Sequence, residues 1–272
     1  GLQDIYFTGN TVSNKLYLNK GDLKFEDITD AAGVGGEGKW SRGVSVVDIN
    51  NDGLQDTYVC ATILADSVKR ENLLYINKGT NEKGIPVFTN MAAAYRLNDP
   101  SHSTMAAFFD YDNDGDLDMY LLINEINKNE FPNKFRPVFR NSENPNTDKL
   151  FRNDWDESLK HPVFTDVSKQ AGITFEGYGH GVTICDINKD GWKDMYVTND
   201  FMPENILYIN NKNGTFSNRE QDYFKHTSSN AMGQDVIDIN NDGLADVIEL
   251  DMSPEDNYRK KTMLSPITYR KF

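Results

Sequence analysis

The sequence predicts an all-β fold, and more narrowly a β-propeller built from four-stranded blades, from three observations. A nine-residue acidic loop of the pattern D-x-[DN]-x-D-G-x-x-D occurs four times. Short runs rich in β-branched and aromatic residues flank each loop, and two more follow it. The loop glycines recur at positions 1, 53, 115, 191 and 243, with spacings of 52, 62, 76 and 52 residues. Repeats of this length and strand content are typical of propeller blades.

Each repeat is expected to contribute four strands in a fixed order, because its apolar runs are bounded by turn residues. The first strand precedes the loop, at 44–47, 106–109, 182–185 and 236–237. The second follows the loop, at 57–60, 119–122, 195–198 and 247–250. The third is predicted at 15–19, 73–77, 149–153 and 206–210, and the fourth around Phe25, Phe88, Phe164 and Phe216. One such sheet cannot bury both faces alone, so radial stacking is expected.

We expect a single partial propeller domain over residues 1–272, with repeat units at approximately 1–39, 40–99, 100–176, 177–227 and 228–272. The segment GLQDIY at residues 1–6 matches GLQDTY at 53–58, so residue 1 is expected to be the glycine of a fifth loop. The chain is therefore interpreted as a fragment of a larger propeller. The third unit has an insertion at about 124–161 that contains Phe131, Phe135, Phe139 and Trp155. This insertion is either a loop that determines ligand specificity or a tolerated insertion whose sequence has drifted within the family.

The four loops have the composition of calcium sites. A hard cation such as Ca2+ takes six to eight oxygen ligands, and oxygen-bearing side chains stand at loop positions 1, 3, 5 and 9. Glycine at position 6 permits the sharp turn that brings them together. About four Ca2+ sites are thus predicted. Their side-chain ligands are Asp48, Asn50, Asp52 and Asp56; Asp110, Asp112, Asp114 and Asp118; Asp186, Asn188, Asp190 and Asp194; Asp238, Asn240, Asp242 and Asp246.

An EF-hand is excluded as the source of this pattern. The EF-hand needs a bidentate glutamate at position 12 and a helix on each side. Position 12 is Val59, Leu121 and Val197 in three loops, and the flanking runs are too short and too β-branched for helices. Dockerin-like pairs of calcium loops are excluded for the same reason.

The chain is acidic, with a formal net charge of -14 and a sequence pI of about 4.7. Four calcium ions would offset more than half of that charge, and no basic stripe suggests nucleic acid as a partner. No apolar run is long enough to cross a membrane. Cys60 and Cys185 lie in strand-like runs and are expected to be buried free thiols, although pairing stays open. Because such calcium sites fill at extracellular calcium levels, an extracellular or outer-membrane surface location is predicted.

On these loops, and on the recurring segment of the Leu-Tyr-Ile-Asn-Lys-Gly type, the chain resembles the FG-GAP/VCBS repeat family, whose calcium-loop propeller also occurs in integrin alpha subunits. It further resembles Bacteroidetes proteins of the ASPIC/UnbV, cartilage acidic protein-like type, through its tail at 249–263. The resemblance implies a propeller of about seven blades. It also implies that the position-7 carbonyl is a calcium ligand, which adds Leu54, Asp116, Trp192 and Leu244. The Asp116 carboxylate either strengthens its site or faces solvent.

A second candidate site is expected where the first strands begin, at the end of each blade away from the calcium loops. Six residues before the first loop aspartate stand Arg42, Thr104, His180 and Met232. A strand of this length places them ~17–20 Å from the loops. A polar ligand or a sugar is predicted at Trp40, Arg42, His102 and His180, with solvated rim residues as the alternative. Trp155 of the insertion is a further predicted ligand-binding residue. His180 is expected to be exposed because Gly179 and Gly181 flank it.

No catalytic residue is predicted, because the sequence has no nucleophile elbow, no His-Glu-x-x-His, no P-loop and no dinucleotide fingerprint. We therefore expect a non-catalytic calcium-binding scaffold for adhesion, glycan binding or a surface protein complex, including one at the outer membrane. It would be secreted or lipid-anchored through a region outside this sequence. The alternative is a calcium-dependent, polysaccharide lyase-like propeller enzyme that acts on extracellular glycans through a rim Arg or His.

Overall fold

The fold is known from a computed structural model, which describes residues 2–126, 137–201, 204–228, 230–252, 256 and 258. Within these residues the chain consists of antiparallel β-sheets and three helices of four residues each. It divides into two compact units. Unit 1 comprises Gly1–Asp110, Gly115–Leu121 and Leu150–Val167, and unit 2 comprises Tyr111–Asp114, Leu122–Lys149 and Ser168–Phe272.

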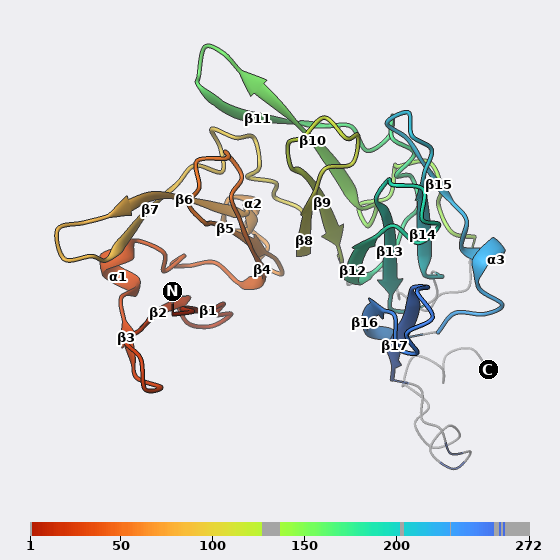
Figure 1. Ribbon diagram of the computed structural model, residues 1–272, viewed down its shortest axis with the longest axis horizontal. Coiled ribbons are helices and arrows are strands. Elements are labelled where there is room, and N and C mark those ends of the chain that lie inside the picture. Colours follow the sequence, from red (N-terminus) through yellow and green to blue (C-terminus); the bar gives the residue numbers. More distant parts are fainter. Residues whose placement is uncertain are drawn as a thin grey trace. The chain divides into compact units, whose positions relative to one another are not determined.

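Unit 1 contains three sheets in which strands that follow one another in sequence are neighbours (Figure 1). The first sheet consists of β1 (Ile5–Phe7), β2 (Lys15–Asn19) and β3 (Phe25–Asp27). The second consists of β4 (Ser41–Val47), β5 (Asp56–Ala61), β6 (Leu73–Thr80) and β7 (Pro86–Asn90). The third, which belongs mostly to this unit, consists of β8 (Ser103–Phe109), β9 (Asp118–Ile123), β10 (Lys149–Asp156) and β11 (His161–Asp166). Helices α1 (Thr29–Ala32) and α2 (Ser67–Arg70) lie in the connections.

Unit 2 contains a four-stranded sheet and a strand pair. The sheet consists of β12 (Gly179–Cys185), β13 (Asp194–Asn199), β14 (Ile206–Asn210) and β15 (Phe216–Asn218), and helix α3 (Glu220–Tyr223) follows it. The pair consists of β16 (Ala231–Ile237) and β17 (Asp246–Asp251).

The core lies between stacked sheets. In unit 1 one cluster joins the first two sheets and α1; its buried members are Leu16, Ile28, Ala32, Val34, Val59, Leu73 and Tyr75. The first strands of successive sheets also touch, β4 with β8 in unit 1 and β12 with β16 in unit 2. Ser45 on β4 donates a hydrogen bond from Oγ to the Ala106 carbonyl on β8, at 2.6 Å. Second strands β5, β9 and β13 are consequently buried along their whole length.

The predicted all-β, four-strand repeat is confirmed as a set of antiparallel sheets. Each predicted run falls within an observed strand, with the acidic loop between the first two. A closed ring and the number of blades stay predictions. No helix among the described residues is both long and apolar enough to cross a membrane.

Two finer expectations need correction. The expectation that both thiols are buried is wrong for Cys185: Cys60 and Cys185 are free thiols, but only Cys60 is buried and Cys185 is half-buried. The insertion is shorter than expected, because β10 already begins at Lys149. Trp155 therefore lies on a strand, paired with Pro162 of β11, and not in an inserted loop. Phe131 and Phe135 lie outside the described residues.

Candidate functional site

The four acidic loops fold in the same way. Their glycines at position 6 have left-handed φ angles of 84°, 97°, 87° and 80°. The residues at position 4 are also left-handed, with φ of 57°, 59°, 59° and 58° for Asn51, Asn113, Lys189 and Asn241. Asparagine tolerates this conformation better than other residues with a Cβ, so the recurring Asn at position 4 was an overlooked signal of the turn.

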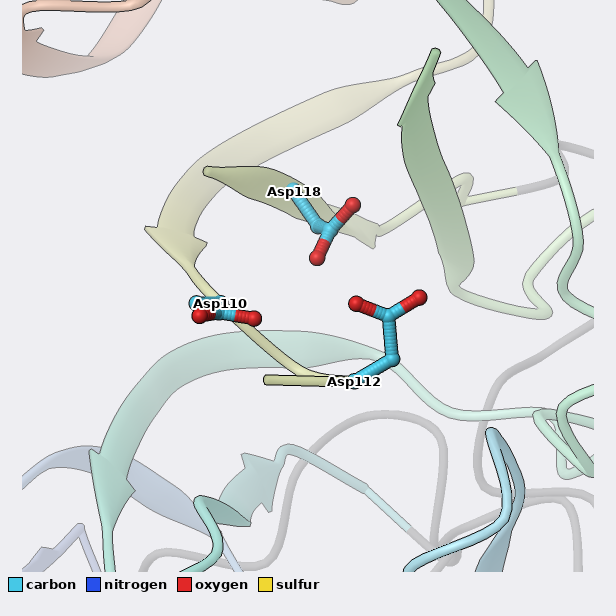
Figure 2. A group of neighbouring side chains, drawn as sticks. All are labelled: Asp110, Asp112 and Asp118. Atoms are coloured by element: carbon cyan, nitrogen blue, oxygen red, sulfur yellow. The ribbon is translucent and has the colours of Figure 1, made fainter. Parts of the chain in front are cut away.

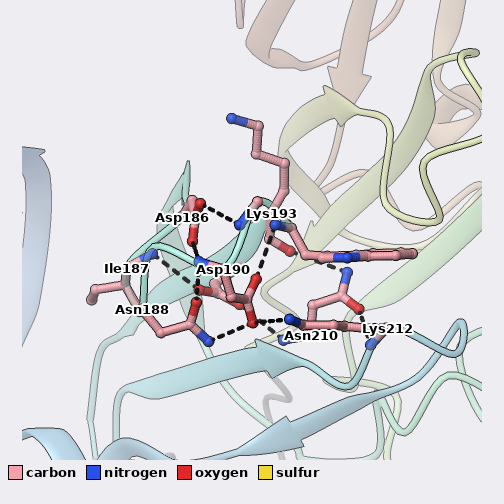
Figure 3. Close-up of polar contacts among 10 residues, drawn as sticks. Asp186, Ile187, Asn188, Asp190, Lys193, Asn210 and Lys212 are labelled. Atoms are coloured by element: carbon pink, nitrogen blue, oxygen red, sulfur yellow. Dashed lines mark hydrogen bonds and ion pairs between the residues drawn. The ribbon is translucent and has the colours of Figure 1, made fainter.

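The side chain at position 1 holds the loop backbone in place. In the loop at 186–194, Asp186 accepts hydrogen bonds from the N–H groups of Asp190, at 2.9 Å, and Gly191, at 2.8 Å (Figure 3). Asn188 accepts from the Asp190 N–H at 3.1 Å and donates to the Asp190 carboxylate at 2.9 Å. The loops at 48–56 and 238–246 have the same bonds between the corresponding atoms. The oxygens at positions 1, 3 and 5 are thus gathered by the loop itself.

The aspartate at position 9 ties the loop to the third strand. Asp194 is fully buried and accepts from the N–H of Ile187, at 3.0 Å, and of Asn210, at 2.9 Å. The Asn210 side chain in turn donates to the Lys193 carbonyl at 3.3 Å. The same arrangement joins Asn19 to Asp4, Asn77 to Asp56 and Asn153 to Asp118. The Asn that ends each Leu-Tyr-Ile-Asn segment therefore acts as a loop anchor, a role that sequence analysis missed.

Burial affects the acidity of this anchored carboxylate. Burial raises the pKa of Asp56 to about 6, and the N–H groups of Asn77 and Ile49 only partly oppose the shift. The pKa of Asp194 is raised for the same reason. A nearby cation favours the ionised form of such a group. Position 9 can therefore hold the backbone and still offer lone pairs to a metal, since each carboxylate oxygen has two.

The loop at 110–118 has the most concentrated negative charge. One carboxylate oxygen from each of Asp110, Asp112 and Asp118 lies within 4.8 Å of the other two (Figure 2). At that separation each pair of unit charges repels by about 1 kcal/mol even in water. Position 3 is Asp here, whereas the other loops have an asparagine whose NH2 group bonds position 5. A divalent cation with oxygen ligands fits this donor set and would offset the repulsion.

The loop at 186–194 differs from the others by its lysines. Asp190, at position 5, forms an ion pair with Lys212 at 3.2 Å. Lys189, at position 4, donates to the carbonyl of Gly243 in the loop at 238–246. Burial acts to raise the pKa of Asp190, but bonds from the Trp192 N–H, Lys212 and Asn188 outweigh it and the net shift is downward. Lys212 was not identified from the sequence, although its place two residues after Asn210 could have marked it.

Two of the residues predicted to bind a ligand at the start of the strands share one pocket of unit 1. Trp40 and Arg42 line it, together with Thr8, Gly9, Asn10, Val12, Ser41 and Ile63. A β-bulge between Ser41 and Val44 interrupts the pairing of β4 at this point. Bulges at the same place in β12 and β16 involve Gly179/Gly181 and Ala231/Gly233. Bulges often direct side chains toward functional sites, and the glycines could have indicated them.

The other three predicted ligand residues do not line this pocket. His102 accepts a hydrogen bond at Nδ1 from the Ile63 N–H, at 3.1 Å, so it supports the wall of the pocket. The expectation that His180 is exposed is wrong: its side chain is 14% exposed, with Nε2 3.3 Å from Nδ2 of Asn124 and 3.9 Å from the Asp200 carboxylate. Trp155 is half exposed on β10. The structure therefore brings Trp40 and Arg42 together in one pocket, and His102 is hydrogen-bonded to Ile63 of the pocket wall.

Comparison with known proteins identifies two similarities. A family model described as an FG-GAP-like repeat matches residues 1–59 and 186–248. Cartilage acidic protein 1 of Xenopus tropicalis is 25% identical over 217 residues, which is 79% of this chain and 29% of the relative. The human and mouse proteins of the same name are each 24% identical over 215 residues, with the same coverage. The chain thus spans less than a third of the length of these relatives.

Proposed function

The chain carries FG-GAP-like repeats and is similar to cartilage acidic protein 1; from this premise we propose that it is a non-catalytic, calcium-stabilised propeller scaffold that works outside the cell. In this proposal residues 1–272 belong to one partial propeller, whose repeats are its blades. Calcium connects the first two strands of each blade, and the opposite strand ends bind a protein or a glycan.

The observation that carries the calcium part is the repeated loop geometry. Four loops have the same two left-handed positions, and in each of them an N–H group of the loop hydrogen-bonds the aspartate at position 1. Preformed loops lose less conformational freedom when a cation binds, which favours binding. Their ligands would be the oxygens at positions 1, 3, 5 and 9 and the carbonyl at position 7.

Calorimetric titration of the EDTA-treated protein with CaCl2 tests this part. About four sites and a clear rise in Tm are expected, because a ligand that binds only the folded state stabilises it by RT ln(1 + [L]/Kd). MgCl2 is the control, since Mg2+ demands a smaller octahedral shell and is expected to bind more weakly. Absence of calcium binding would overturn the proposal.

The pocket around Trp40 and Arg42 supports the partner-binding part. An indole and a guanidinium next to the Thr8 and Asn10 side chains suit a ligand with an apolar ring face and an anionic or polar group. Acidic glycans and acidic peptides of cell surfaces have this chemistry. The calcium loop of the same sheet follows the other end of β4, so metal and ligand are expected to bind separately.

Binding to a panel of matched acidic and neutral oligosaccharides and peptides tests this part. Wild type is compared with Arg42→Gln and Trp40→Ala, and Trp155→Ala on β10 is the control for loss of an exposed indole. Specific loss with the first two variants is expected. Turnover of an acidic polysaccharide that Arg42→Gln abolishes would instead favour the lyase-like enzyme. Equal losses in all three variants would remove the pocket from the proposal.

A further inference from the structure

The loops at 186–194 and 48–56 have the same oxygen donors but different charges. Both carry aspartate at positions 1, 5 and 9 and asparagine at position 3. The loop at 186–194 also carries Lys189 and Lys193, whereas the other three loops contain no basic residue. Its nine residues therefore sum to a formal charge of minus one, compared with minus three for the loop at 48–56. The ion pair with Lys212 brings the local sum to zero.

Lys212 stands where two other repeats have glycine. It lies two residues after Asn210, as Gly21 and Gly79 lie two residues after Asn19 and Asn77. In all three turns the backbone N–H of the residue at this position donates to the side-chain oxygen of the asparagine, at 2.8, 2.9 and 2.9 Å for Lys212, Gly21 and Gly79. The backbone φ angle at this position is 61° for Lys212, 85° for Gly21 and 83° for Gly79. A lysine in this left-handed position is strained relative to glycine.

The ammonium group of Lys212 is placed on a predicted calcium ligand. It lies 3.2 Å from Oδ2 of Asp190, the side chain at position 5. At the same position of their loops, Asp52 and Asp242 have no ion pair among the residues that the structure describes. A divalent cation that uses the Asp190 carboxylate must displace this ammonium group or bind beside it. Either event opposes binding, because like charges repel.

We propose that Lys212 is an internal competitor for calcium, which makes the loop at 186–194 the weakest of the predicted calcium sites. Binding of calcium there releases the Lys212 side chain from Asp190. The sites then fill in order of charge: the loop at 110–118 first, those at 48–56 and 238–246 next, and the loop at 186–194 last. This inference rests on the proposed calcium binding and adds an order of filling to it.

Trp192 makes this site measurable on its own. It occupies position 7 of the loop, and its N–H bonds Asp190 at 3.0 Å. Tb3+ substitutes for Ca2+ at oxygen sites, and a tryptophan next to it sensitises its luminescence. Excitation at the red edge of the tryptophan band therefore reports Tb3+ in this loop, and Trp192→Phe identifies the signal by removing it.

The experiment is a Tb3+ titration followed by displacement with CaCl2, for wild type, Lys212→Gly and Lys193→Gln. Lys212→Gly introduces the residue that two other repeats carry. Lys212→Gln removes the same positive charge without the added backbone freedom of glycine. Lys193→Gln is the matched control, because Gln55 is its counterpart in the loop at 48–56 and the change removes one positive charge from the same loop.

Both Lys212 variants are expected to bind Tb3+ and Ca2+ roughly threefold to tenfold more tightly at this site, and Lys193→Gln to bind with a smaller gain. Unchanged affinity in both Lys212 variants, or an equal gain in Lys193→Gln, would overturn the role of Lys212. If no variant gives a sensitised signal while calorimetry shows calcium bound at the other loops, this loop is not a metal site and the inference fails alone. If calorimetry shows no calcium binding at all, the proposed function fails with it.

Discussion

The loops at 186–194 and 238–246 have the same backbone, but the strands that follow them differ greatly in burial. Every residue of β13 is buried, whereas β17 is half-buried to exposed, with Ile248 44% and Leu250 67% exposed. β13 pairs with β12 and β14, while β17 pairs, among the described residues, with β16 alone. The comparison teaches that nine residues suffice to form the loop, and that burial of the strand depends on its neighbours.

The largest effect is expected from deleting apolar side chains directly after the two loops. Met195 is fully buried on β13, and its counterpart Val247 on β17 is half-buried. Met195→Ala is expected to lower the free energy of unfolding by about 3 kcal/mol, because it leaves a cavity, and Val247→Ala by about 1 kcal/mol. Urea denaturation measures both. Equal losses of unfolding free energy would mean that β17 is buried in solution to the same extent as β13.

The position-9 aspartates give the next effect. Asp194 accepts hydrogen bonds from two backbone N–H groups, one of them on β14. Asp246 accepts one, from the N–H of Ile239 at 3.1 Å. Asp194→Ala leaves two donors in a buried region without an acceptor and is expected to lower stability by about 2–3 kcal/mol, and Asp246→Ala by about 1 kcal/mol. The measurement is urea denaturation in EDTA, so that metal plays no part. Similar losses at the two sites would contradict the anchoring role of Asn210.

The contrast between the two loops shows how far the sequence alone reaches. The strands and the turn glycines follow from patterns within a few residues, so the sheets around Leu73 and Ile206 were predicted correctly. The anchoring by Asn210, the bulge before Val44 and the exposure of Leu250 depend on contacts between separate segments. No local pattern encodes such contacts, although repetition of the same residue at the same place suggests them.

The position-5 aspartates separate metal effects from backbone effects. Asp242→Ala is expected to lower stability by about 1 kcal/mol in millimolar CaCl2 and to change it little in EDTA. The reason is that a calcium site with a millimolar-range Kd stabilises the fold by RT ln(1 + [L]/Kd), which is zero when calcium is absent. Asp52→Ala and Asp190→Ala are expected to follow the same rule, with the smallest calcium-dependent loss for Asp190→Ala. Thermal unfolding in the two buffers measures this. Losses of the same size with and without calcium would show that these carboxylates act on the backbone.

The smallest effect concerns Lys212, the residue that distinguishes the two loops most. In EDTA, Lys212→Gly is expected to change the free energy of unfolding by less than about 0.5 kcal/mol. Relief of the left-handed conformation favours the variant by up to ~1 kcal/mol. Loss of the ion pair with the half-buried Asp190 carboxylate, and the greater freedom of glycine in the unfolded chain, oppose it by similar amounts. In CaCl2 the variant should become the more stable protein, because its loop binds calcium more tightly. A variant that is less stable than wild type in both buffers would show that the lysine supports the fold and does not compete with calcium.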